Sequence, residues 1–74
     1  MAIPLEYFRY RDVFIDYPFE DVLFRYEHGS RRFFRKFYGE SNEKEVPHDN
    51  RLLNEAISSG DEIDATNYHT GKAS

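Results

Sequence analysis

The residues best suited to recognise a partner lie in one basic and aromatic segment. Four cationic side chains fall within six consecutive positions, and four aromatic rings are interleaved with them. The segment comprises Arg31, Arg32, Phe33, Phe34, Arg35, Lys36, Phe37 and Tyr38. Arginine and aromatic residues are enriched at protein interfaces, whereas cations beside aromatic rings also suit phosphates and unpaired bases. The segment therefore predicts a surface that binds a larger protein or, as the alternative, nucleic acid.

The same segment has a purely structural interpretation, in which its cations face solvent and pair with acids such as Glu20, Asp21 or Glu27. The formal net charge of −4 argues against nucleic acid, because dedicated nucleic-acid-binding domains are usually basic. The acidic excess lies in residues 43–74, which hold seven acidic and three basic side chains.

Patterns that would indicate catalysis are weak. His28 and Ser30 are neighbours in the sequence, but the Gly-x-Ser-x-Gly pattern that exposes a nucleophilic serine does not surround them. Phosphate-binding glycine loops do not occur either, and the chain has four glycines. We therefore predict that the protein is not an enzyme.

Metal-binding patterns are weak as well. The three histidines lie about twenty residues apart and no cysteine accompanies them. Asp61, Glu62 and Asp64 place three carboxylates in four residues, but the spacing does not match a calcium-binding loop. We expect no cofactor and no metal, and we interpret these acids as a solvated turn or as a contact for a basic partner.

Length and composition favour one small domain. A chain of 74 residues buries a modest core, and aromatic residues, at 18% of the sequence, supply much apolar area per side chain. Cysteine is absent, which is typical of a reducing compartment. Neither a membrane-spanning apolar run nor a signal-peptide pattern occurs in the sequence. We expect a cytoplasmic protein, in its own cell or in a host cell.

The elements that must position the basic segment can be read in two ways. Aromatic and β-branched residues favour strands over 7–17, 22–26 and 31–38, with a turn over 27–30. The competing helical interpretation rests on the spacing of Phe19, Val22, Leu23 and Tyr26. We favour strands, because the stretch is poor in strong helix formers.

A helix is clearer further along the chain. Asp49 or Asn50 can cap it, its apolar stripe runs through residues 52–57, and Gly60 can end it. We expect residues 1–60 to form the domain and residues 61–74 to form a polar tail, anchored by Ile63 and Tyr68 if it is ordered. The predicted fold class is α+β, a small antiparallel hairpin or three-strand meander with one C-terminal helix. An all-α bundle is the alternative.

These observations favour a small protein-binding module that regulates or inhibits a larger macromolecule, of the accessory type found in phages and mobile elements. Nucleic-acid binding through residues 31–38 is the first alternative. The second is a structural subunit of a larger assembly, including a homo-oligomer, because a small domain sometimes needs a neighbour to complete its core.

Overall fold

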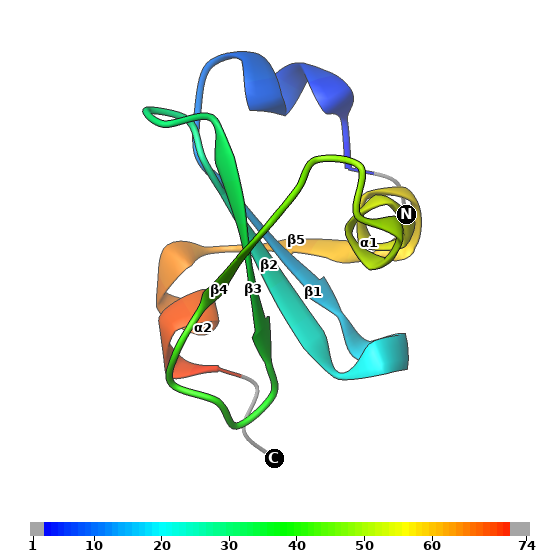
Figure 1. Ribbon diagram of the computed structural model, residues 1–74, viewed down its shortest axis with the longest axis vertical. Helices are drawn as coiled ribbons and strands as arrows, with labels where there is room; N and C mark the ends of the chain where they lie inside the picture. The colour runs from blue at the N-terminus through cyan, green and yellow to red at the C-terminus, as the bar shows by residue number, and fades with distance from the viewer. Residues whose placement is uncertain (1–2, 72–74) are drawn as a thin grey trace.

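A computed structural model describes residues 3–71, and within them the chain forms a five-stranded antiparallel sheet in the order β4-β3-β2-β1-β5 (Figure 1). The strands are β1 (Val13–Tyr17), β2 (Val22–Glu27), β3 (Arg32–Phe37), β4 (Lys44–Val46) and β5 (Asp61–Ile63). The helices are α1 (Arg51–Ser59) and α2 (Ala65–Thr70), with 3-10 helices η1 (Leu5–Arg9) and η2 (Pro18–Glu20). The fold is α+β, as predicted, and the all-α alternative is wrong.

The strand interpretation of the aromatic stretch is correct because strand pairing puts aromatic side chains opposite aromatic or β-branched ones. In the β2–β3 hairpin Tyr26 lies opposite Phe33, and Val22 lies opposite Phe37. Such cross-strand pairs stabilise a sheet. The turn falls where it was expected, and the Arg31 amide donates to the Glu27 carbonyl over 2.8 Å. Within this turn Arg31 takes the left-handed conformation, with φ of 60°.

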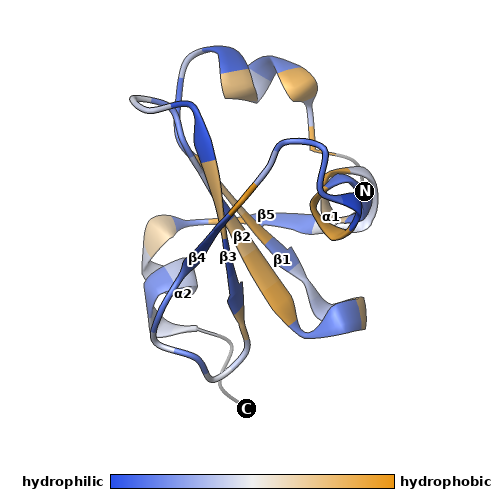
Figure 2. Ribbon diagram, viewed as in Figure 1, coloured by the Kyte–Doolittle hydropathy of each residue, from blue (hydrophilic) through white to orange (hydrophobic). Residues whose placement is uncertain are grey.

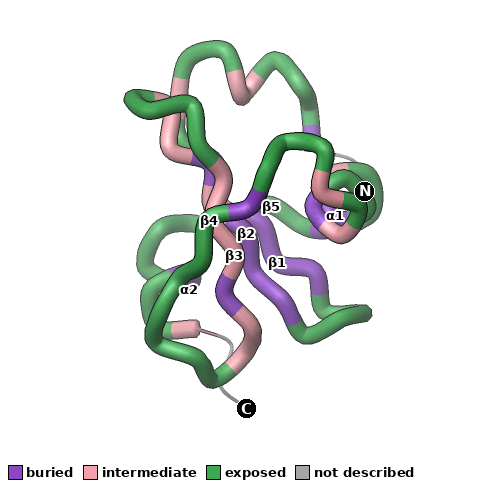
Figure 3. The backbone as a smooth tube through the Cα atoms, in the orientation of Figure 1, coloured by how far each residue is buried: buried purple, intermediate pink, exposed green. Residues whose placement is uncertain are grey.

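Both faces of the sheet are covered. One face holds the main core, which α1 and the N-terminal segment close; it is built from Ile3, Val13, Ile15, Tyr17, Val22, Phe24, Tyr26, Val46, Leu53 and Ala56. The other face buries Leu23 and, on α2, Tyr68, both with no exposed surface. The buried residues concentrate along β1 and β2 (purple in Figure 3), and much of β2 is also strongly hydrophobic (orange in Figure 2).

Helix α1 matches its prediction at both ends. The Asn50 side chain accepts a hydrogen bond from the Leu53 amide over 2.9 Å, so Asn50, and not Asp49, is the N-cap. Gly60 follows the helix where α1 meets β1. A methyl group there would lie 2.6 Å from the Ala56 carbonyl oxygen and 2.9 Å from that of Asp16. Close backbone approach, and not a positive φ, therefore requires glycine.

Three features differ from the predictions. The meander has two further strands, β4 and β5, which are only three residues long and carry no strand pattern of their own. The strand expected over 7–17 begins at Val13, because residues 5–9 form η1. Residues 61–70, where we expected a polar tail anchored by Ile63 and Tyr68 if it is ordered, form β5 and α2. Strand β5 pairs with β1 through residues that include Ile63, and Tyr68 is buried. Residues 72–74 of that tail lie outside the described residues.

Candidate functional site

The predicted binding segment, residues 31–38, coincides with strand β3 and its two ends. Because β3 lies between β2 and β4, alternate side chains point to the two covered faces of the sheet. Phe33 and Phe37 pack against the main core. The Phe33 ring lies 4.8 Å from that of Tyr26 and 5.9 Å from that of Phe8, measured between centroids. These two phenylalanines therefore contribute to folding before they can contribute to binding.

Lys36 is the least exposed member of the segment. Its side chain points to the face that α2 covers, and the residue is 4% exposed. The Nζ atom donates a hydrogen bond to the Tyr68 carbonyl over 2.7 Å and lies 4.5 Å from the centroid of the Tyr68 ring. This ammonium group satisfies a carbonyl near the end of a helix and is not displayed to a partner.

Phe34 lies on the same face beneath an arginine. The guanidinium carbon of Arg25 is 4.3 Å from the centroid of the Phe34 ring. Arg25 also donates to both carboxylate oxygens of Glu43, over 2.6 and 2.9 Å, and to Glu27 over 3.1 Å. Glu43 in turn accepts a hydrogen bond from the Tyr68 hydroxyl over 2.7 Å. A charged network therefore connects the sheet to α2 beside the aromatic ring.

The pKa shifts in this network follow from its hydrogen bonds. The hydrogen bonds from the Arg25 guanidinium lower the pKa of the Glu43 carboxyl below its usual value. Partial burial acts in the opposite direction and is the smaller effect. Burial, and then the hydrogen bond to Glu43, raises the pKa of the Tyr68 hydroxyl. Each shift favours the protonation state that the network needs at neutral pH, a carboxylate that accepts and a phenol that donates.

The accessible part of the segment lies at its N-terminal end. Arg31 and Arg32 are exposed at the β2–β3 turn, and Arg32 makes a long ion pair with Glu45, at 3.6 Å. Arg35 is half-buried, with its guanidinium carbon 4.9 Å from the centroid of the Phe37 ring. At the other end of the segment, the Tyr38 hydroxyl donates to the buried carboxylate of Asp16.

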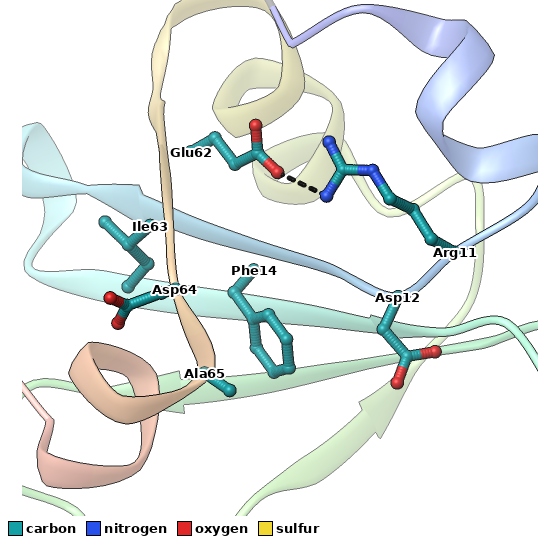
Figure 4. Close-up of a pocket in the computed structure, with 7 residues that line it drawn as sticks. All are labelled: Arg11, Asp12, Phe14, Glu62, Ile63, Asp64 and Ala65. Atoms are coloured by element: carbon teal, nitrogen blue, oxygen red, sulfur yellow. Dashed lines mark hydrogen bonds and ion pairs between the residues drawn. The ribbon is translucent and has the colours of Figure 1, made fainter.

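Two of the three acids of residues 61–64, Glu62 and Asp64, line a shallow groove with a volume of about 400 Å³. Its lining consists of Arg11, Asp12, Phe14, Glu62, Ile63, Asp64 and Ala65 (Figure 4). Arg11 donates to Glu62 over 2.8 Å, whereas the Asp64 side chain caps α2 by accepting from the Asn67 amide over 2.8 Å. The tertiary structure therefore gives two of these acids local partners. Across residues 3–71, no group of three or more potential ligand side chains could hold a metal ion.

Sequence reasoning missed the large apolar side chains that face solvent. Among the described residues these are Leu5, Tyr10 and Phe19, with exposed fractions of 71, 59 and 80%. Leu5 belongs to η1, Tyr10 follows it, and Phe19 lies in η2 at the tip of the β1–β2 hairpin. The signal was local: Phe19 directly follows Pro18 in a turn.

In the same described part of the chain, no helix is long and apolar enough to cross a membrane.

Comparisons with known proteins identify relatives over nearly the whole chain. A family model described as "Tis1 immunity protein" matches residues 1–72. The chain is 48% identical over 67 residues to "Immune protein Tis1" of Pseudomonas aeruginosa (strain UCBPP-PA14), a match that covers 89% of this chain and 87% of that protein. It also superposes, with a TM-score of 0.90 and 43% identity, on a chain from the crystal structure of the complex between the Type VI effector Tas1 and its immunity protein. That match covers 99% of this chain and 97% of the other.

Proposed function

Because this chain belongs to the Tis1 immunity protein family, we propose that it is itself an immunity protein, which binds a Type VI effector similar to Tas1 and inhibits it. The observation that carries the proposal is the likeness to a chain from the Tas1 complex, which extends over 99% of the sequence at 43% identity. In this proposal the chain inhibits by occupying a surface of the effector, a mode of action that needs no catalytic group.

The size of the chain fits this role. A standard protein interface covers roughly 800 Å² on each partner, about a sixth of the 4833 Å² that this chain exposes. One such contact can therefore be made by one side of the molecule. The phage or mobile-element origin suggested by small size stays a prediction.

The binding segment predicted from the sequence is tested through its exposed end. Arg31 and Arg32 project from the β2–β3 turn, so replacing both with Ala removes two cations without opening the core. If the segment contacts the effector, this double variant binds more weakly. The Phe34 and Phe37 rings are unsuitable for this test, because Phe37 packs against the core and Phe34 lies beneath Arg25.

The test of the proposed function is direct. We would mix the purified chain with Tas1 and with the protein most similar to Tas1 that is encoded in the same genome as this chain, here called the cognate effector. A complex on size-exclusion chromatography, a Kd by isothermal titration calorimetry, and restored growth of cells that express the effector would support the proposal. Failure to bind either protein at micromolar concentration would remove it.

A further inference from the structure

The β1–β2 hairpin ends in a short tip, Pro18-Phe19-Glu20-Asp21, that presents one aromatic ring to solvent. Phe19 has the largest exposed fraction, 80%, among the large apolar side chains of the described residues. We infer that this ring is the anchor of the interface: it enters an apolar pocket of the effector whose rim carries basic side chains. The inference rests on the proposed function, since it names the part of the chain that recognises the effector.

The ring contributes little to the fold that displays it. It makes an edge contact with Tyr17, at 5.9 Å between ring centroids and an interplanar angle of 63°, and the rest of its surface faces solvent. The apolar area that folding leaves exposed becomes available for burial in a complex. Single aromatic anchors that fill a pocket commonly dominate the binding energy of an interface.

The tip is held in one conformation from both sides. Strand pairing continues to its base, where Tyr17 lies opposite Val22. Asp21 adopts the left-handed conformation, with φ of 53°, and its amide donates to the Pro18 carbonyl over 3.3 Å. The Asp21 carbonyl accepts from the Tyr38 amide over 2.8 Å, which ties the tip to the end of β3.

This geometry has two consequences for binding. A non-glycine residue in the left-handed region is unfavourable and persists where its surroundings fix it, often at sites that bind ligands. A ring displayed on a fixed backbone loses little conformational entropy when it is buried by a partner. Pro18 adds to this rigidity by fixing its own φ angle.

The charge around the ring defines the partner. Glu20 and Asp21 directly follow Phe19, and both are exposed. Within residues 3–71 neither carboxylate forms an ion pair. Two such tips would repel each other, which argues against a second copy of this chain as the occupant. A pocket with an apolar floor and a basic rim matches the tip in both shape and charge.

The experiment measures the Kd of the cognate effector by calorimetry for the wild-type chain and three variants. Phe19→Ala removes the anchor, and we expect a Kd at least about 30-fold higher. Phe19→Tyr keeps the ring and should stay within about fivefold of the wild-type value. The matched control is Leu5→Ala, which removes a similarly exposed apolar side chain from η1 at the opposite end of the molecule (dark blue, with η2 in cyan, in Figure 1).

The possible outcomes distinguish failure of the Phe19 anchor from failure of the proposed immunity function. Loss of affinity in Phe19→Ala alone, with an unchanged thermal unfolding midpoint, supports the anchor. A wild-type chain that binds and a Phe19→Ala variant that binds equally well overturn the anchor and leave the immunity function standing. Equal losses in Phe19→Ala and Leu5→Ala also overturn it, because the effect is then not specific to the tip. A wild-type chain that binds neither Tas1 nor the cognate effector overturns the proposed function.

Discussion

Glu43 shows how single side chains hold the second face of this sheet together. Its carboxylate receives two hydrogen bonds from Arg25 and one from the Tyr68 hydroxyl. The first partner belongs to β2 and the second to α2, whereas Glu43 itself comes from the loop before β4. One carboxylate therefore connects three parts of the chain, and charge-assisted hydrogen bonds of this kind are stronger than neutral ones.

Glu43→Gln should lower the free energy of unfolding by about 2 kcal/mol at pH 7, since the charged acceptor is lost. The effect depends on pH. The folded state holds the pKa of Glu43 below its ordinary value of 4.5, so the stabilisation is present above that value and disappears as the pH falls through the lower, folded-state pKa. Urea unfolding at pH 7 and at pH 3 would measure it. The difference between wild type and variant should shrink at the acidic pH, and a difference that grows there would contradict the assignment.

Lys36 provides the second prediction at the scale of residues. Lys36→Ala removes the charged one of two donors to the Tyr68 carbonyl, the other being the Gly71 amide, and it opens space beneath α2. We therefore expect a loss of about 2 kcal/mol in stability. Arg32→Ala is the control, because exposed ion pairs contribute little; it should change stability by less than about 0.5 kcal/mol. If chemical denaturation finds the two variants equally stable, Lys36 has no structural role at this position.

At the scale of elements, α1 and α2 are held in different ways. Helix α1 packs Leu53 and Ala56 into the main core, both without exposed surface. Helix α2 is six residues long and too short to be stable alone. It docks through Tyr68, whose ring lies 5.3 Å from that of Phe14 and whose two polar groups bind Lys36 and Glu43. The C-terminal element is therefore built from long-range contacts around one side chain.

The junction between α1 and β5 gives the prediction for this scale. Gly60→Ala forces a methyl group against two backbone carbonyl oxygens, and backbone shifts of this sort cost about 1 to 3 kcal/mol. Gly29→Ala is the matched control, because nothing lies within 4 Å of the added carbon at that position. Thermal unfolding of the two variants should show a lower midpoint for Gly60→Ala, with Gly29→Ala close to wild type. Equal midpoints would mean that α1 can move away from β1 at little cost.

At the scale of the whole molecule, the charge distribution distinguishes protein binding from nucleic-acid binding, the two classes that the sequence left open. The net charge is −4. Folding also leaves fewer cations of the basic segment available to bind a partner. Lys36 is buried and Arg32 faces Glu45. A phosphate backbone would therefore meet a weakly basic patch on an acidic molecule. A protein partner with a basic surface fits this distribution better.

We accordingly expect no electrophoretic shift of a single-stranded oligonucleotide by the chain at about 50 mM salt. Arg31→Glu combined with Arg32→Glu serves as the control for any shift that does occur. A shift that disappears in this variant and weakens steeply with salt would restore nucleic-acid binding as a function. It would also move the site from the β1–β2 tip to the β2–β3 turn.

The sequence alone determined the features that depend on neighbouring residues. The residue types of 22–38 favoured strands and the turn between them, and the capping pattern around Asn50 and the apolar stripe behind it predicted α1. These are local preferences, so the pattern in the chain carries them. The α+β class followed from their combination, as did the expectation of a protein-binding inhibitor from small size and weak catalytic motifs.

The tertiary structure alone decided which side chains are available for function. A strand pattern says that alternate residues point to opposite faces, but it does not say whether both faces are covered. Helix α2 covers Lys36 through Tyr68, which is thirty-two residues away in the sequence. Phe33 and Phe37 pack against the main core on the other face. In the opposite sense, Phe19 has the composition of a core residue and is left in solvent because η2 carries it beyond the sheet. Burial is set by contacts between segments that are distant in sequence, and for that reason the sequence pattern identified the aromatic residues without showing which of them remain free to meet a partner.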